Sequence, residues 1–181
     1  LVCRVGFRKN RGMSAILSPG AQPGHHLLTH EAGRLVARFA DGRLCSLLTL
    51  PPDAPAPPIL QHDSSDWNTL RAALDRYLSG MPEHFAGIAL HWEQGTDFQR
   101  QVWRAACEVP WGSTATYGEL AARLNLGKGA ARAVGHALGA NPFHIVVPCH
   151  RFVSSTGGLV GYAGGLEWKQ ALLRIEGILV L

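Results

Sequence analysis

The spacing of apolar residues changes once along the chain, near residues 92–96. Before that point, short strand-like runs are separated by the turn sequences EAG and DG, and they cover 27–30, 34–40 and 43–50. After it, apolar residues recur with helical spacing. Strands followed by helices predict an α+β fold with an antiparallel sheet in the first half. We expect a small N-terminal α/β domain over residues 1–92 and a mostly helical C-terminal domain over residues 96–181.

The segment between the predicted sheet and residue 92 contains a connector, a helix and a further strand. The connector PPDAPAPPILQHD, at 51–63, has too many prolines for a helix or a central strand. Ser65 or Asp66 then caps a helix that Gly80 and Pro82 end. Its apolar stripe consists of Trp67, Leu70, Leu74, Tyr77 and Leu78. The run GIALHW at 87–92 predicts one more strand.

Four helices are predicted in the second half. A capping box from Thr96 to Gln99 begins the first, which ends at Pro110. A second box, from Thr116 to Glu119, begins a helix that runs to about residue 124. The loop NLGKG leads to a helix over about 130–140, and the pair is typical of a helix-turn-helix. The last helix runs over about 166–176, before a glycine.

Composition and charge favour a folded protein that is compatible with a nucleic-acid partner. The 181 residues are 46% hydrophobic, which suits a packed core rather than a disordered chain. A net charge of +4 and a pI of ≈9.1 are mildly basic. No apolar stretch approaches the ~20 residues that cross a bilayer, and no secretion signal follows Met13. We therefore expect a cytoplasmic protein with no membrane partner.

Cysteine spacing gives no sign of a metal site. Four cysteines occur, and none is part of a CxxC pair: Cys3, Cys45, Cys107 and Cys149. This spacing argues against a zinc ribbon or a thioredoxin-type site, and reduced thiols are the expectation in a cytoplasmic protein. Residues 1–12 precede Met13 and are left out of the expected fold, as a disordered arm or a non-native segment.

The predicted helix near residues 130–140, GAARAVGHALGA, is built almost entirely of small residues. Its two glycines cost about 1 kcal/mol each relative to alanine, so something should approach its backbone closely. One interpretation is tight packing on a neighbouring helix. The other is a helix that enters a nucleic-acid groove with Arg132 as its one long side chain. It lacks the side chains that read major-groove bases, which favours a narrow groove and an extruded base.

Cys149 and His150 are adjacent in the sequence IVVPCH. The β-branched run predicts an extended backbone up to Pro148, in which neighbouring side chains point to opposite faces. A direct bond between thiol and imidazole is then not expected, and a water would have to connect them. Taken alone, a cysteine after an apolar run is most often a buried inert thiol.

The segments TYGELA, GANP, VPCHRFV, GYAGG and LLRIEG occur in this order along the chain. Together they resemble the O6-alkylguanine-DNA alkyltransferase family (methylated-DNA–protein-cysteine methyltransferases), in particular its stand-alone bacterial type. The resemblance covers about residues 96–177. It implies a ribonuclease-H-like N-terminal domain and a C-terminal domain that binds DNA. It also implies one irreversible alkyl transfer to a cysteine from flipped O6-alkylguanine, and more weakly from O4-alkylthymine, without a cofactor.

The resemblance also implies roles for single residues. Cys149 is the nucleophile, and His150 is its base through a water. Glu176 orients His150, and Asn141 ties the predicted helix-turn-helix to the cysteine segment. Tyr117 donates a hydrogen bond to the flipped guanine.

Further residues are implied in DNA binding and in the substrate pocket. Arg132 replaces the extruded nucleotide in the base stack. The remaining expected DNA contacts are Ala131, Ala133, Gly135, Thr116, Lys128 and Ser155. The expected pocket residues are Pro148, Phe152, Tyr162, Ala163, Gly164 and His144. Phe152 and His144 are larger than the residues expected there and should narrow the pocket for bulky alkyl groups.

The implied partner is double-stranded DNA containing O6-alkylguanine, bound mainly through the minor groove by a monomer that can cluster on DNA. Three alternatives remain. A non-enzymatic lesion sensor of this type would lack the cysteine, whereas Cys149 is present. A cysteine hydrolase would turn over many times. A plain transcription factor would be poorly served by a helix of small residues.

Overall fold

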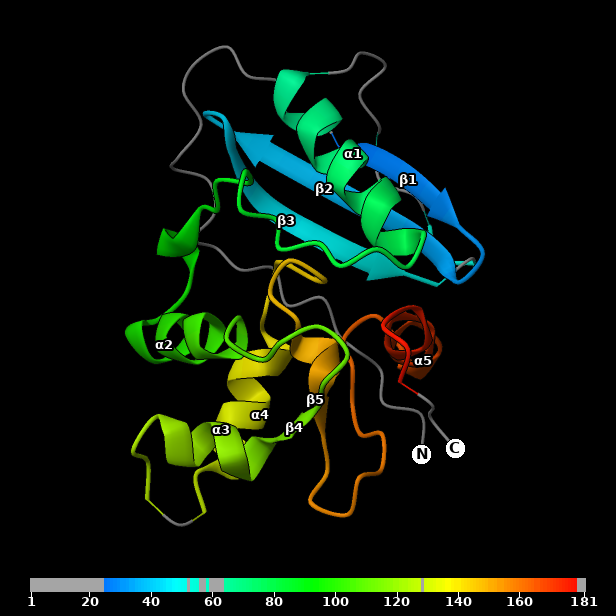
Figure 1. Ribbon diagram of the computed structural model, residues 1–181. Helices are drawn as coiled ribbons and strands as arrows, with labels where there is room; N and C mark the ends of the chain where they lie inside the picture. Colours follow the sequence, from blue (N-terminus) through cyan, green and yellow to red (C-terminus); the bar gives the residue numbers. More distant parts are fainter. Residues whose placement is uncertain (1–24, 52, 56–57, 59–63, 128, 179–181) are drawn as a thin grey trace.

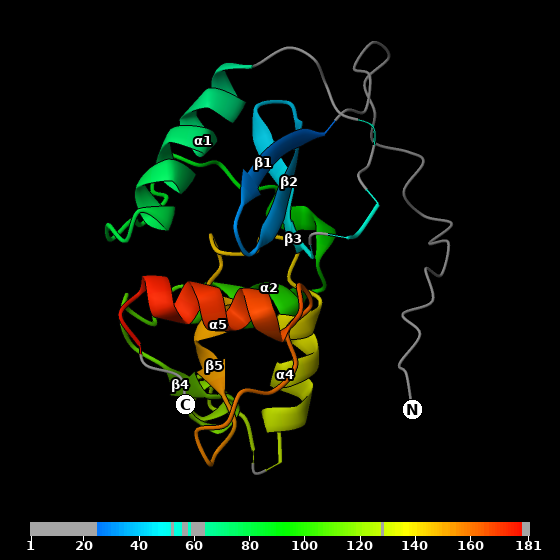
Figure 2. The ribbon, with the colours of Figure 1, turned by 90° about the vertical axis from the view of Figure 1, so that its right-hand side faces the viewer.

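The computed structural model describes residues 25–51, 53–55, 58, 64–127 and 129–178. The expectations for residues 1–12 and for Lys128 lie outside the described residues. Figures 1 and 2 show a sheet covered by one helix, with the remaining helices below it. The division into domains at residues 92–96 stays a prediction.

The first half forms an antiparallel sheet of three strands in the order β1-β2-β3, and helix α1 lies across one of its faces. The strands are β1 (His26–His30), β2 (Gly33–Ala40) and β3 (Arg43–Leu50). Each agrees with a predicted run to within one residue. Helix α1 (Ser65–Leu78) buries its predicted apolar stripe apart from Leu78, which is partly buried. Its cap is Ser64, whose hydroxyl accepts the Trp67 N–H, rather than Ser65 or Asp66.

The strand predicted at 87–92 is wrong. Leu44 N donates to Ala89 O (2.8 Å) and His91 N donates to Leu44 O (2.9 Å), so the segment meets β3 at one isolated bridge. A turn precedes the bridge, because Ile88 N donates to Phe85 O and Phe85 has φ +52°. A short 3₁₀ helix, η1 (Trp92–Gln94), follows it. These turns leave too few extended residues for a strand.

The described residues of the second half form four α-helices and a short parallel strand pair. The helices are α2 (Asp97–Ala106), α3 (Tyr117–Arg123), α4 (Ala131–Gly139) and α5 (Leu166–Ile175). Both predicted capping boxes are present. Helix α2 ends before Pro110 because Glu108 N and Val109 N bond to carbonyls three residues back. The strands β4 (Ala115–Thr116) and β5 (Phe152–Val153) pair in parallel.

These elements confirm the α+β fold with an antiparallel sheet. Helices α3 and α4 pack against each other and lie side by side in Figure 1. Their interpretation as a helix-turn-helix stays a prediction.

The segment before Cys149 is a series of tight turns, and the predicted extended backbone is wrong. Val146 N donates to His144 O (2.9 Å) across Ile145, which has φ +71°. Cys149 N donates to Val147 O (2.8 Å) across Pro148, whose φ −80° and ψ 59° make an inverse γ-turn. A 3₁₀ helix, η2 (Cys149–Arg151), follows directly. The β-branched residues therefore lie in turns, because hydrogen bonds outweigh their strand preference here.

Strand β3 joins the two halves at this series of turns. Leu47 N donates to Pro142 O and His144 N donates to Leu47 O, both at 2.8 Å. The His144 ring lies against the next residues of the strand: its Nδ1 accepts the Thr49 N–H (3.1 Å), and the Thr49 hydroxyl is 2.8 Å away. His144 is buried. The sheet thus holds the backbone that leads to Cys149.

We expect His144 to make the fold less stable in mild acid. Protonation of Nδ1 would remove the acceptor that Thr49 uses, and burial, together with the nearby charge of His150, lowers the pKa of His144 to about 4. The unfolded chain titrates near 6.5, so this contribution is complete above that pH and is lost as the pH falls toward 4. Between about pH 7.5 and about pH 5, the free energy of unfolding should fall by about 2 kcal/mol on this account.

Urea unfolding over this pH range checks the expectation. A His144→Asn variant offers Thr49 an amide oxygen that does not titrate, so its stability should depend less on pH by about the same amount. Equal pH dependence in the two proteins would show that His144 does not carry the effect.

Candidate active site

Cys149 lies at the first position of η2, and the side chain of Asn141 holds the turn around it. Asn141 Nδ2 donates to Val147 O (3.0 Å) and to Cys149 Sγ (3.1 Å). Asn141 Oδ1 accepts the Phe143 N–H (2.9 Å). One amide therefore bonds to both ends of the turns and to the sulfur. Asn141 follows α4 directly, so it connects that helix to Cys149.

The Cys149 thiol is protonated at neutral pH in this environment. Burial raises its pKa to about 11, although the Asn141 hydrogen bond and the nearby charge of Lys169 act in the opposite direction. At pH 7 such a thiol is ionised in about one molecule in ten thousand. A thiolate nucleophile at this position therefore needs a base.

His150 points to a buried carboxylate. Its Nε2 lies 2.8 Å from Glu176 Oε1, at the C-cap of α5, and both side chains are buried. Arg151 donates from Nε to Glu176 Oε2 and from Nη2 to Oε1, each at 2.9 Å. The Tyr77 hydroxyl donates to Oε1 as well (2.6 Å).

These donors keep Glu176 ionised. Burial acts to raise its pKa, but the hydrogen bonds from His150 and Arg151 outweigh burial and lower the pKa to about 2. Burial lowers the pKa of His150, while Glu176 acts to raise it. Because Nε2 carries the proton that Glu176 accepts, Nδ1 is the unprotonated nitrogen. Nδ1 is buried and has no hydrogen-bond partner among the described residues.

Lys169 is a buried cation that lies near the cysteine segment. Its Nζ donates to Phe152 O (2.6 Å) and Val160 O (2.8 Å), and the residue is 0% exposed. Burial lowers its pKa to about 8, and the proximity of Cys149 acts in the opposite direction. Lys169 thus joins β5 to the segment at Val160 and places positive charge near the sulfur.

Cys149 opens into a pocket of ≈360 Å³, which is within the range of sites for small molecules. The wall residues come from α3, from α4 and from the glycine-rich segment after Val160. They are Tyr117, Gly135, Leu138, Gly139, Cys149, Val160, Gly161, Tyr162 and Ala163. The sulfur is thus buried against the protein but reachable from a pocket.

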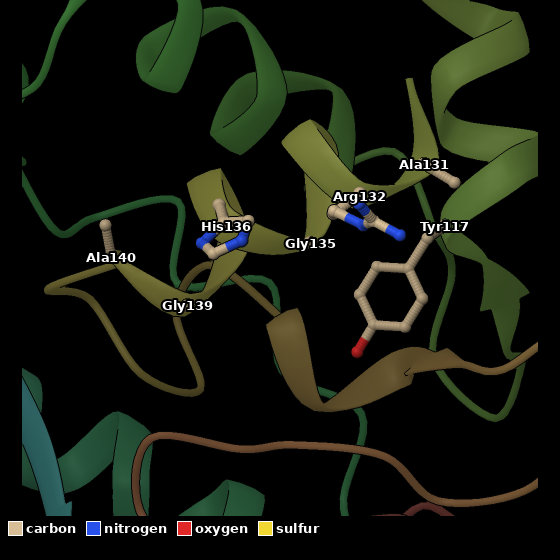
Figure 3. A pocket seen from close by; sticks show the side chains of 7 residues that line it. All are labelled: Tyr117, Ala131, Arg132, Gly135, His136, Gly139 and Ala140. Carbon is tan, nitrogen blue, oxygen red and sulfur yellow. The ribbon is translucent and has the colours of Figure 1, made fainter. Parts of the chain in front are cut away.

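A second hollow of ≈630 Å³ runs over the outer surface of α4 and shares Tyr117, Gly135 and Gly139 with the pocket. Figure 3 shows the side chains of Arg132 and His136 projecting from the helix, with the Tyr117 ring beside Gly135. His136 is exposed as well. The prediction that Arg132 is the one long side chain on this helix is therefore wrong. We call this surface the α4 groove.

The α4 groove shows which side of the small-residue helix is packed and which side is open. The buried side chains of α4, which face α2 and α3, are Val134, Ala137 and Leu138. A Cβ added at Gly139 would meet no atom of the described chain within 4 Å, and one at Gly135 would make ordinary contact with Tyr117. The glycines therefore do not serve helix packing, and they leave the surface open to something outside the chain.

Of the other predicted DNA contacts, one lines a hollow and three line neither. Ala131 lines the α4 groove and Ala133 is exposed on the same helix. Thr116 caps α3 and uses its hydroxyl in the capping box. Ser155 is exposed in the turn after β5.

Four predicted pocket residues do not line the pocket itself. Phe152 is fully buried beside Tyr117, with ring centroids 6.2 Å apart. Pro148 is buried in its γ-turn, and His144 faces Thr49. Gly164 is packed so tightly on Thr49 that a Cβ would collide with it. Phe152 and His144 thus contribute to the layer behind the pocket rather than to its wall.

Four residues at the site were not predicted from the sequence: Tyr77, Arg151, Lys169 and His136. Signals for two of them were present: Lys169 is a cation within the apolar stripe of α5, and Arg151 follows His150 directly. Tyr77 was recognised only as a core residue, because nothing nearby in the sequence shows what its hydroxyl contacts. Among the described residues, no group of three His, Cys, Asp or Glu side chains could hold a metal ion. No helix in the described part is long and apolar enough to span a bilayer.

Comparison with known proteins identifies the family. The family model described as 6-O-methylguanine DNA methyltransferase, DNA binding domain, matches residues 97–178. A methylated-DNA–protein-cysteine methyltransferase from Haemophilus influenzae is 40% identical over 149 residues, covering 81% of this chain and 82% of that protein. One from Mycobacterium tuberculosis is 41% identical over 124 residues, covering 66% of this chain and 72% of that protein.

Solved structures agree with the sequence matches. The crystal structure of Mycobacterium tuberculosis OGT in complex with DNA matches with a TM-score of 0.71 and 35% identity. The match covers 85% of this chain and 93% of that one. The resemblance in residues 96–177 is thereby confirmed. The chain belongs to the methylated-DNA–protein-cysteine methyltransferase family.

Proposed function

We propose that the protein repairs DNA by moving an alkyl group from the O6 atom of guanine, and more weakly from O4 of thymine, to Cys149. The transfer happens once per molecule. The observation that carries the proposal is Cys149, whose sulfur is held by Asn141 and which lines a pocket that shares Tyr117, Gly135 and Gly139 with the α4 groove. A base extruded from DNA on that groove would reach the sulfur through the pocket.

The reaction is a displacement at the alkyl carbon. His150 removes the thiol proton at Nδ1 through a water, and the sulfur forms a bond to the alkyl carbon while the carbon–O6 bond breaks. The electron pair of that bond goes to guanine, and the Tyr117 hydroxyl in the pocket wall donates a hydrogen bond to the leaving base. The thioether product has no good leaving group, so the protein is spent.

Glu176 and Arg151 serve the proton transfer. Glu176 accepts the Nε2–H of His150, so it selects the tautomer with Nδ1 free and stabilises the imidazolium that forms. Arg151 holds Glu176 with two hydrogen bonds. The Lys169 charge near Cys149 favours the thiolate in the same step.

The partner is double-stranded DNA, bound as a monomer in the cytoplasm and mainly through the minor groove. The small residues of the α4 groove allow the helix to approach a narrow groove closely, and the long side chains beside them are those of Arg132 and His136. Arg132 projects from this surface and replaces the extruded nucleotide in the stack. Ala131, Ala133, Gly135, Thr116 and Ser155 would lie against the DNA.

The alternatives make different predictions at the same sulfur. A lesion sensor would bind damaged DNA and leave Cys149 unchanged. That Cys149 lines the pocket supports transfer instead. A cysteine hydrolase would need water to release its product, and it would turn over.

Methyl transfer to Cys149 is the first expected outcome. Incubation with duplex DNA containing O6-methylguanine should add one methyl group per protein molecule, on Cys149, and then stop, because a thioether is stable. Peptide mass spectrometry measures the site and the stoichiometry. Cys149→Ala should still bind the DNA and transfer nothing, while Cys107→Ser, which removes an exposed thiol, should transfer normally. An unmodified Cys149 would leave a sensor, and repeated turnover would indicate a hydrolase.

Replacement of Arg132 should separate duplex repair from the chemical step. Arg132→Ala should slow transfer from duplex DNA by about tenfold to a thousandfold, because an extruded base returns when nothing fills its place. Transfer from the free base O6-methylguanine should change by less than about twofold, because a free base needs no extrusion. Single-turnover rates on the two substrates are the measurement.

Two control variants separate the effect of losing the Arg132 side chain from the effect of losing a positive charge. Arg71→Ala removes an exposed cation from α1, away from the α4 groove, and should affect neither substrate. Arg132→Lys keeps the charge without the planar guanidinium and should repair duplex poorly. Equal losses on duplex and free base would exclude Arg132 from base extrusion.

A further inference from the structure

Tyr77 connects the N-terminal half of the chain to the His150–Glu176 pair. It lies on α1, and its hydroxyl donates to Glu176 Oε1 (2.6 Å) and is 3.2 Å from His150 Nε2. The residue is 0% exposed. The sequence places it in an apolar stripe, yet its oxygen is bound to the proposed catalytic groups.

We propose that Tyr77 is a positioning residue for alkyl transfer, whose hydroxyl orients Glu176 and limits the basicity of His150. This inference rests on the proposed function of Cys149. It assigns a part in the chemistry to the N-terminal half, for which the sequence motifs imply no catalytic residue.

Core packing alone does not account for the hydroxyl. The Tyr77 ring packs against Phe85 and Trp111, with centroids 5.8 and 5.0 Å apart, and a phenylalanine ring would make the same contacts. A buried hydroxyl costs free energy unless it is hydrogen-bonded. Here the hydrogen bond goes to the one carboxylate that His150 also uses.

Three side chains donate to Glu176 Oε1: His150 from Nε2 at 2.8 Å, Arg151 from Nη2 at 2.9 Å and from Nε at 3.2 Å, and Tyr77 from its hydroxyl at 2.6 Å. A carboxylate oxygen has two lone pairs in its plane, so these donors compete. The hydroxyl therefore takes negative charge away from the bond to His150. Without it, Glu176 would stabilise the imidazolium more strongly, and His150 would stay protonated to a higher pH.

The Tyr77 hydroxyl remains protonated and therefore remains a hydrogen-bond donor in this arrangement. Burial, together with the charge of Glu176, holds its pKa well above the usual value, so the phenol keeps its proton throughout the working range of pH. The hydroxyl thus acts on His150 as a neutral dipole rather than as a charge. The titratable and charged groups around His150, from α1, the turns before Cys149, η2 and α5, are Tyr77, His144, Cys149, Arg151, Lys169 and Glu176.

The test is the pH dependence of transfer in Tyr77→Phe, which removes the hydroxyl and keeps the ring. Single-turnover methyl transfer from duplex DNA would be measured from about pH 5 to about pH 9. We expect the acid limb of the rate profile to move up by about one pH unit, the effect of one hydrogen bond to a charged group. The final stoichiometry should stay at one methyl group per molecule.

A direct titration of His150 gives a second measurement that does not depend on the reaction. Nitrogen-15 NMR of labelled histidines should show the His150 pKa rising in Tyr77→Phe. Thr49→Val is the matched control, because it removes a different hydroxyl between the sheet and the cysteine segment, one bound to His144 and not to Glu176. It should leave the acid limb and the His150 titration where they are in the unaltered protein.

The outcomes separate this inference from the proposed function. If the unaltered protein gains no methyl group on Cys149, the proposed function fails. If it does gain one, and Tyr77→Phe either keeps the same profile or loses rate by one factor at every pH, then Tyr77 has a structural role only and the inference is overturned. An unchanged His150 titration would overturn it as well.

Discussion

The side-chain amide of Asn141 is the interaction on which the site depends. It bonds to Phe143 N and Val147 O. These bonds close the turns before Cys149, which the β-branched residues of that segment do not favour. The third bond, to Cys149 Sγ, uses the same amide group. Because Asn141 directly follows α4, the position of the sulfur is tied to the helix that lines the groove. Reactive atom and binding surface therefore share one anchor.

Burial acts to raise the pKa of both Glu176 and Cys149, but only Glu176 has enough donors around it to stay ionised. The carboxylate of Glu176 stays ionised because His150, Arg151 and Tyr77 all donate to it, whereas the thiol of Cys149 stays neutral because one amide is a weak substitute for water. The negative charge thus rests on Glu176 until a substrate arrives. Such a site protects its thiol from oxidation, since oxidation requires the thiolate.

Local sequence patterns predicted the elements that depend on residues a few positions apart. The strands β1 to β3, the stripe of α1 and both capping boxes belong to this group. Patterns failed at 87–92 and before Cys149, where pairing with β3 and the Asn141 amide decide the backbone. The partners of Glu176 were beyond local analysis, because Tyr77 is 99 positions away and joins it only in the folded chain.

The bare outer surface of α4 has a consequence for how damage is found. A protein that surveys a genome must tolerate every neighbouring sequence, and the glycines and alanines of this surface leave few side chains, chiefly Arg132 and His136, by which to prefer one. Discrimination between damaged and undamaged bases is then left to the step in which a single base enters the pocket beside the sulfur. Recognition and reaction then become one event, and an undamaged base returns to the stack unchanged.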